Sequence, residues 1–167
     1  METSHQSPLE RIASKAHWAE RFFLVVLIAG VGLRYGGMQM MPLIYLGLVG
    51  LAITYFLFAF RVPDVPRPEN GKEEKFGFLD LLMTSIVPKV LGIGMAVSMM
   101  GTLFFLLEYE GYPQMLQLGG TTIVVCYALI VLSGSIAKYG RLLAPMLLRS
   151  LLVVAVVGYV IFIAGSK

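Results

Sequence analysis

The segment Met41–Phe60 (MPLIYLGLVGLAITYFLFAF) decides the fold class, because it is long, apolar and free of charged residues. A helix needs about 20 such residues to cross about 30 Å of hydrocarbon. Charge returns directly after the segment, at Arg61. The pattern therefore predicts a membrane-spanning helix at about residues 41–60.

Three later segments have the same character. Apolar runs predict spans at about residues 87–107, 116–136 and 145–165. The last run is strictly apolar for only part of its length, so we expect Arg149 to extend toward the membrane surface. These runs place most of the chain in the bilayer.

The first apolar segment, Phe22–Leu33, is shorter and lies between Arg21 and Arg34. Two interpretations fit it: the core of a signal peptide, or a true span whose flanking arginines reach the surface. An acid-containing stretch precedes the segment and another apolar run follows it at once. Both features favour a true span, at about residues 20–36.

The composition agrees with a membrane protein, since 57% of the 167 residues are hydrophobic and only 14% are charged. The mean hydropathy is +0.80. Such values exclude a disordered chain, a nucleic-acid-binding arm and an ordinary cytosolic enzyme. The sequence predicts an all-α, polytopic integral membrane protein of about five transmembrane helices.

Basic residues give the expected orientation. With five spans, eleven of the thirteen lysines and arginines fall on one side of the membrane, and only Arg34 and Lys167 fall on the other. Because cytoplasmic segments are enriched in lysine and arginine, we expect the N-terminus in the cytoplasm and the C-terminus outside. The expected location is the inner (cytoplasmic) membrane.

Two hydrophilic segments flank the first spans. Residues 1–20 carry apolar residues at helical spacing and predict a cytoplasmic or interfacial arm. Residues 61–86 begin with three prolines and a mixed charge run, typical of an extended cytoplasmic loop. Apolar residues then recur at helical spacing in residues 79–86 and predict a short interfacial segment.

The two halves of the chain resemble each other. The sequence interval from Gly30 to Gly101 equals the interval from Pro42 to Pro113. The interval from Gly47 to Gly119 is longer by a single position. These offsets predict two helical hairpins in parallel orientation, with a fifth helix outside the repeat.

Residues 101–119 (GTLFFLLEYEGYPQMLQLG) begin and end with glycine and contain a Leu-Phe pair near the start and a Met-Leu pair near the end. In this pattern the segment resembles the transmembrane hairpin of GldL-like proteins, the membrane subunit of the gliding-motility and type IX secretion motor of Bacteroidetes. Phe105 stands where that family has lysine, and Glu108-Tyr109-Glu110 replaces His-Trp-Pro. The resemblance implies an inner-membrane hairpin, and a motor component is one alternative function.

Small residues predict where helices approach each other closely. Without a hydrophobic force between helices in lipid, association depends on close backbone packing at such positions. The predicted packing residues are Gly47, Gly50, Gly94, Ser98, Gly101 and Gly119.

Arg34 and Glu108 fall at the same predicted side of the membrane, so we expect them to form an outer ion pair. The alternative is a proton or cation site at Glu108. Methionines cluster nearby at Met38, Met40 and Met41. Thioethers suit Cu(I), but no histidine or cysteine is near in sequence, and methionine also fills irregular gaps in protein cores.

No catalytic motif is present in the sequence, and its single cysteine, Cys126, excludes an internal disulfide and a Cys-based metal site. We therefore expect no enzyme activity, cofactor or metal. The expected function is a small non-catalytic membrane subunit that packs with larger membrane proteins, in contact with lipid and not with nucleic acid. The alternatives are an oligomeric channel or transporter for a small ion or solute, and the motor component.

Overall fold

A computed structural model describes residues 8–38, 40–60, 81–133 and 136–165 of the chain. These residues form an all-α fold, as predicted, and none of them lies in a β-strand. The elements are α1 (Pro8–Tyr35), α2 (Met41–Phe58), the π-helical turn η1 (Leu82–Ile86), α4 (Val87–Leu106), α5 (Tyr112–Leu132) and α6 (Ile136–Gly165).

Four helical segments among the described residues are long and apolar enough to cross a membrane. They are Met41–Phe58, Leu82–Leu106, Tyr112–Leu132 and Ala144–Phe162. A polytopic membrane protein is therefore consistent with the structure. Among the described residues, α1 is not one of these segments.

The second of these segments starts earlier than the predicted boundary at residue 87. η1 continues directly into α4, so Leu82–Ile86 belong to one continuous helix with Val87–Leu106. Pro88 lies in the first turn of α4, where η1 supplies the preceding helical turn. The first two residues of the predicted interfacial segment, 79 and 80, lie outside the described residues.

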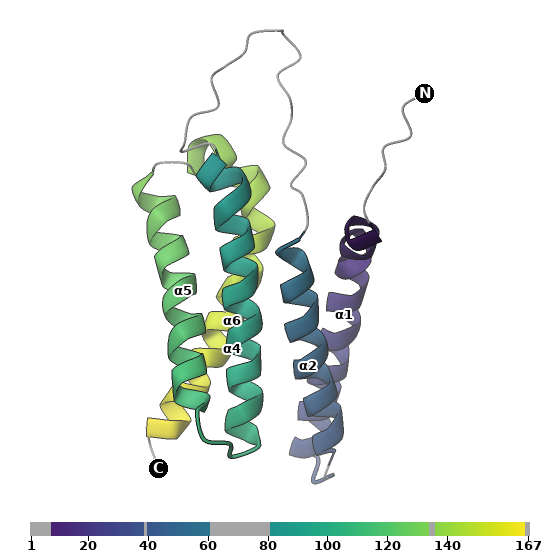
Figure 1. The fold of residues 1–167 in the computed structure, drawn as a ribbon. Coiled ribbons are helices and arrows are strands. Elements are labelled where there is room, and N and C mark those ends of the chain that lie inside the picture. Colours follow the sequence, from purple (N-terminus) through teal and green to yellow (C-terminus); the bar gives the residue numbers. More distant parts are fainter. Residues whose placement is uncertain (1–7, 39, 61–80, 134–135, 166–167) are drawn as a thin grey trace, which may run out of the picture.

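The helices alternate in direction along the bundle (Figure 1). α1 and α2 form one hairpin, and α4 and α5 form a second. α2 packs against α4, and α6 packs across α4 and α5. As a result, the described start of α1 and the described end of α6 lie at opposite ends of the molecule (Figure 1).

α4 forms the centre of the bundle. Leu91 and Met95 on this helix are fully buried, and they belong to one apolar core with Ile123 of α5 and Val153 of α6. About half of the residues in the apolar spans of α2 and α4 are buried, against 28% of those in the α5 span and 24% of those in the α6 span. α5 and α6 thus leave most of their apolar surface uncovered.

α1 and α4 end in the same backbone motif. Gly37 and Glu108 adopt left-handed conformations, with φ of 84° and 57°. The residue after each donates a hydrogen bond five residues back, from Met38 N to the Leu33 carbonyl at 3.0 Å and from Tyr109 N to the Phe104 carbonyl at 2.9 Å. These are Schellman closures, and the second adds an edge-to-face contact between the Phe104 and Tyr109 rings.

Candidate functional site

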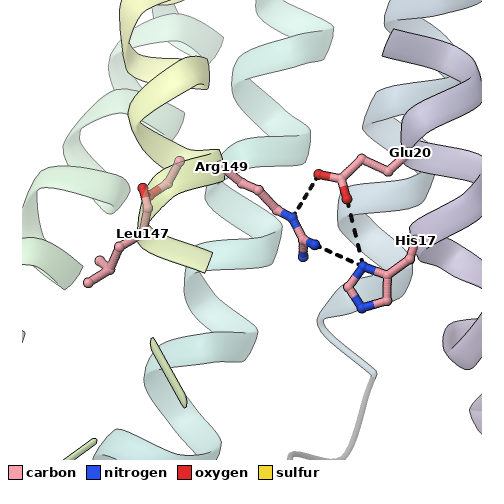
Figure 2. A network of polar contacts seen from close by, with 5 residues as sticks. His17, Glu20, Leu147 and Arg149 are labelled. Atoms are coloured by element: carbon pink, nitrogen blue, oxygen red, sulfur yellow. Dashed lines mark hydrogen bonds and ion pairs between the residues drawn. The ribbon is translucent and has the colours of Figure 1, made fainter. Parts of the chain in front are cut away.

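A cluster of charged and aromatic side chains connects α1 to α6. Figure 2 shows Arg149 extending from α6 toward Glu20 and His17 on α1. The Arg149 Nε lies 3.0 Å from Glu20 Oε1, and its Nη2 lies 2.8 Å from His17 Nδ1. His17 Nδ1 is 3.9 Å from Glu20 Oε2. The three side chains therefore form one continuous polar network.

The helix α1 positions two of these groups together. His17 and Glu20 are three residues apart, so they lie on the same helix face. Phe58, at the end of α2, supports the cluster: the Arg149 guanidinium lies 4.9 Å from its ring centroid, and the His17 ring centroid lies 5.2 Å away. Cation–π attraction to Phe58 adds to the ion pair in holding the guanidinium in place.

Burial makes this network energetically important. Glu20 is only 8% exposed and the Arg149 side chain 23%, so both ionisable groups are largely shielded from water. A carboxylate taken out of water needs a paired charge and hydrogen bonds to remain ionised. Arg149 supplies both, and α1 otherwise packs mainly against α2. The cluster is thus the main described link between α1 and α6.

His17 contacts Arg149 through its Nδ1 atom. Every guanidinium nitrogen is a donor, so a neutral His17 accepts this hydrogen bond at Nδ1.

A second polar network lies one residue further along α6. The Tyr127 hydroxyl of α5 donates to the Leu147 carbonyl at 2.8 Å and lies 2.9 Å from Ser150 Oγ. Ser150 Oγ in turn donates to the same carbonyl at 2.9 Å and is fully buried. The network fixes α6 against α5 next to the residue that contacts α1.

The predicted packing residues of α2 lie against α1. A Cβ atom at Gly47 would stand 2.8 Å from Leu27 Cβ and 2.9 Å from Leu27 Cα. At Gly50 it would overlap the ring of Phe23. The two glycines therefore allow α1 and α2 to approach each other more closely than alanine would permit.

The other four packing residues lie between α4 and α5. A Cβ at Gly119 would stand 2.8 Å from Ser98 N and 2.9 Å from the Gly94 carbonyl oxygen. One at Gly101 would lie 3.0 Å from Leu116 N. The backbones of α4 and α5 are thus in close contact along this interface. Ser98 is fully buried, and its Oγ has no hydrogen-bond partner in the described structure.

The structure does not bring Arg34 and Glu108 together. Both are exposed, at the same end of the bundle, but no ion pair joins them among the described side chains. Arg34 Nη1 instead donates to Met41 Sδ at 3.2 Å. The reason is the helix order: α1 packs mainly on α2, and α2 in turn packs on α4.

The methionine cluster is mostly open to the surroundings. Met38 is 56% exposed and Met40 39%, and Met41 accepts the Arg34 hydrogen bond. No group of three or more His, Cys, Asp or Glu side chains that could hold a metal ion occurs among the described residues. The contact of Met41 Sδ among the described side chains is with the Arg34 guanidinium.

Sequence reasoning missed the Glu20–Arg149 cluster. Arg149 was expected to extend toward the membrane surface, but it points to Glu20 on α1. The sequence does contain a signal: each residue is a charge at the border of an apolar segment, and the two are opposite in sign. Nothing in their separation along the chain indicates that α1 and α6 are neighbours.

An apolar pocket of about 800 Å³ lies between α5 and α6. Most of its lining is aliphatic, including Val124, Val154 and Ile161. Every residue in this lining is neutral. The pocket is thus a second candidate site, distinct in chemistry from the charged cluster.

No protein-family model, curated protein or solved structure matches this chain. The resemblance of residues 101–119 to GldL-like hairpins accordingly stays a prediction.

Proposed function

We propose that the protein is a small non-catalytic integral membrane subunit that packs with larger membrane protein partners. In this proposal it crosses the inner membrane five times, with α1 as the first span. Its N-terminus is then cytoplasmic and its C-terminus outside. The observation that carries the proposal is the uncovered face of α1.

α1 is covered on one side only. It packs along α2 through Gly47 and Gly50 and meets α6 at the charged cluster. Trp18, Phe22 and Val25 on its outer side are 75%, 61% and 63% exposed. A span with charged borders is stabilised in a membrane by contacts with other helices, so this uncovered face favours a protein neighbour.

The exposed residues of α1 also have the spacing of a helix-packing seam. Trp18, Phe22, Val25 and Ala29 are all exposed and follow one another at intervals of four, three and four residues. This is the a/d spacing by which two helices interlock side chains over several turns. We expect one helix of the partner to lie along this seam.

The two hairpins support the parallel repeat as part of the proposal. Their Schellman closures at Gly37 and Glu108 lie at the same end of the bundle and at equivalent positions of the predicted repeat. The close approach of Gly47 to Leu27 in the first hairpin corresponds to that of Gly119 to Ser98 in the second. If α1–α2 repeats α4–α5, the position that α6 occupies on the second hairpin has no equivalent helix on the first.

Site-specific photocrosslinking in intact cells tests the proposal. A photoreactive amino acid replaces Phe22 on the seam or, as the control, Val131 on α5, which is also 61% exposed. We expect Phe22 to give a discrete adduct with another membrane protein and Val131 to give none. The adduct should co-purify in mild detergent at fixed stoichiometry.

Other results contradict the proposal. Adducts of Phe22 with a second copy of this chain alone, together with ion flux in liposomes, indicate the oligomeric channel or transporter. Equal diffuse labelling at Phe22 and Val131 indicates that α1 faces lipid or water and has no fixed partner.

A further inference from the structure

His17 is the member of the charged cluster that water reaches most easily. Its side chain is 36% exposed, against 23% for that of Arg149 and 11% for that of Glu20. Histidine is also the side-chain type whose ordinary pKa, about 6.5, lies within the physiological range. A proton can therefore reach the imidazole from solvent while the ion pair beside it stays largely enclosed.

Ionisable groups from three helices lie around this point. Glu20 and Arg21 belong to α1 and Arg149 to α6, and Tyr55 of α2 is close enough to interact electrostatically with Glu20 and Arg149. In water a carboxyl group titrates below about pH 5, and phenol and guanidinium groups titrate above about pH 9. A response near neutral pH therefore points to His17, and a response at lower pH points to Glu20.

Protonation of His17 removes the acceptor that Arg149 uses. A neutral His17 accepts from Arg149 Nη2 at Nδ1, over 2.8 Å. An imidazolium carries hydrogen on both ring nitrogens and can only donate, so this hydrogen bond cannot form. Two positive groups would then lie 2.8 Å apart in a cluster with little water to screen them. The arrangement in Figure 2 is therefore specific for neutral His17.

The protonated ring has a new partner within reach. Glu20 Oε2 lies 3.9 Å from His17 Nδ1, so a small side-chain rotation brings an imidazolium to the carboxylate. Glu20 Oε1 pairs with Arg149 Nε at 3.0 Å. One carboxylate would then be shared by two cations, and one of them lies on its own helix. The pair within α1 is strengthened at the expense of the pair that joins α1 to α6.

The two sides of the link differ in what else holds them. α1 packs mainly against α2, and Arg149 supplies the ion pair and the hydrogen bond that join α1 to α6. α6 is held to α5 by the hydroxyl groups of Tyr127 and Ser150, which carry no charge. We propose that the cluster is a pH-sensitive latch, in which protonation of His17 releases α1 from α6.

The direction of the effect follows from proton binding. The joined arrangement requires neutral His17 and the released arrangement takes up the proton, so release is favoured as the pH falls. The link should be intact above about pH 7.5 and lost as the pH falls to about 6.5 and below. The latch goes beyond the proposed function, because it requires no protein partner and stands even if α1 has none.

Distances between spin labels, measured by double electron–electron resonance, test the latch in the full-length protein in lipid nanodiscs. One pair of labels is attached through Val25→Cys on α1 and Leu152→Cys on α6, at positions that are 63% and 51% exposed. The control pair uses Val25→Cys and Ile53→Cys on α2, where Ile53 is 56% exposed. Cys126, which is buried, is replaced by alanine in every sample.

We expect the distances between α1 and α6 to lengthen from about pH 8 to about pH 5.5, with the joined fraction reduced about fivefold or more. The control distances should not change, because Gly47 and Gly50 allow close packing of α1 on α2 that does not depend on charge. His17→Gln should abolish the lengthening, since the glutamine amide oxygen accepts from Arg149 at every pH. His5→Gln removes the other histidine as the matched control, and the lengthening should persist.

Three results would overturn the proposal. The first is an unchanged distance between α1 and α6 at the lower pH. The second is a full lengthening in His17→Gln, which would assign the response to Glu20. The third is an equal change in the control pair, which would indicate general unfolding.

His17→Arg keeps the test decisive if His17→Gln does not fold, as judged by circular dichroism and size-exclusion elution. Arginine carries a permanent positive charge, so this variant should show the long distances at every pH. Short distances in a folded His17→Arg protein at about pH 8 would contradict the latch.

Discussion

Glu20 and Arg149 show how one pair of residues links distant parts of the chain. They belong to the first and last helices, yet their charged atoms lie 3.0 Å apart. Neither charge is well hydrated, since Glu20 is buried and Arg149 is mostly enclosed. Removing one member of such a pair leaves the other buried without compensation, which costs more than removing both.

Arg149→Met should therefore lower the free energy of unfolding by about 3–5 kcal/mol. The double variant Glu20→Gln with Arg149→Met should recover much of that loss, because no uncompensated charge remains. Unfolding in mixed detergent micelles, followed by circular dichroism, measures both values. The two single variants and the double variant form a mutant cycle that gives the coupling directly.

Arg34→Met is the control for this cycle. Arg34 is exposed and donates only to Met41 Sδ among the described groups, so we expect a change within about 0.5 kcal/mol. If Arg149→Met costs no more than Arg34→Met, the cluster does not hold α1 to α6.

Gly119 and Gly120 are adjacent residues with opposite surroundings. Gly119→Ala places a Cβ against the backbone of Ser98 and Gly94, and we expect a loss of about 1–3 kcal/mol from overpacking. Gly120→Ala has room and should gain about 0.5–1 kcal/mol, because alanine favours the helix. Thermal unfolding of the two variants in the same detergent compares them. Equal effects would mean that α4 and α5 are not in backbone contact.

At the scale of elements, the ends of α1 and α4 show how similar turns arise from different residues. Gly37 has no side chain to oppose its positive φ, whereas Glu108 adopts the same region with a full side chain. For a residue other than glycine this conformation costs roughly 1–2 kcal/mol. The strain is local to the turn, because the hydrogen bonds that close the two motifs are alike.

Gly37→Ala should consequently destabilise the protein by about 1 kcal/mol, although a Cβ there meets no atom within 4 Å. Glu108→Gly should stabilise it by up to about 1 kcal/mol, since relief of strain exceeds the added freedom of the unfolded chain. Melting temperatures measure both effects.

Gly32→Ala controls this pair, because Gly32 lies within α1 and also has open space around it. It should be neutral or stabilising. A loss at Gly32 as large as that at Gly37 would rule out backbone strain as the cause.

Element boundaries were predictable to the extent that they depend on local chemistry. Pro42 and Pro113 lie in the first turn of α2 and α5. Proline has no N–H group, but an N–H in the first turn has no partner within the helix, so no helix hydrogen bond is lost there. Helical spacing in residues 79–86 was visible in the sequence, but the direct continuation of Leu82–Ile86 into α4 was not, because a π-helical turn has no marked sequence pattern. α1 is likewise continuous from Pro8, with no break between the predicted arm and the first span.

At the scale of the whole molecule, the described helices α1, α2, α4, α5 and α6 alternate in direction along the bundle. The described start of α1 and end of α6 lie at opposite ends of the bundle (Figure 1). If α1 crosses the membrane beside α2, the termini lie in different compartments. If α1 lies outside the membrane, only four spans remain. The segment before the first of these spans and the segment after the last then lie on the same side of the membrane.

Reporter tags at the two termini distinguish these arrangements. We expect a tag at Met1 to be protected from a membrane-impermeant probe in intact cells, and a tag at Lys167 to be labelled. Permeabilised cells provide the control in which both tags react. Labelling of both tags, or of neither, in intact cells would show that α1 is not a fifth span.

The candidate sites were predictable to different degrees. Gly94, Gly101 and Gly119 could be selected from sequence, because small residues at helical spacing in membrane helices mainly serve close helix–helix packing. No ion pair joins Arg34 and Glu108 among the described side chains, because charge sign and depth do not specify which helices are neighbours. Glu20 and Arg149 have equally plausible charges and do meet.

The sequence by itself determined the helical class, the apolar segments and the small residues that suit close packing, because hydrophobic length and side-chain size are local properties. Only the tertiary structure decided that α2 separates α1 from α4, that α6 meets α1 through Arg149, and that α5 and α6 enclose a pocket. In a bundle of similar apolar helices, many neighbour arrangements satisfy the same pattern. The choice between them depends on how particular surfaces fit together.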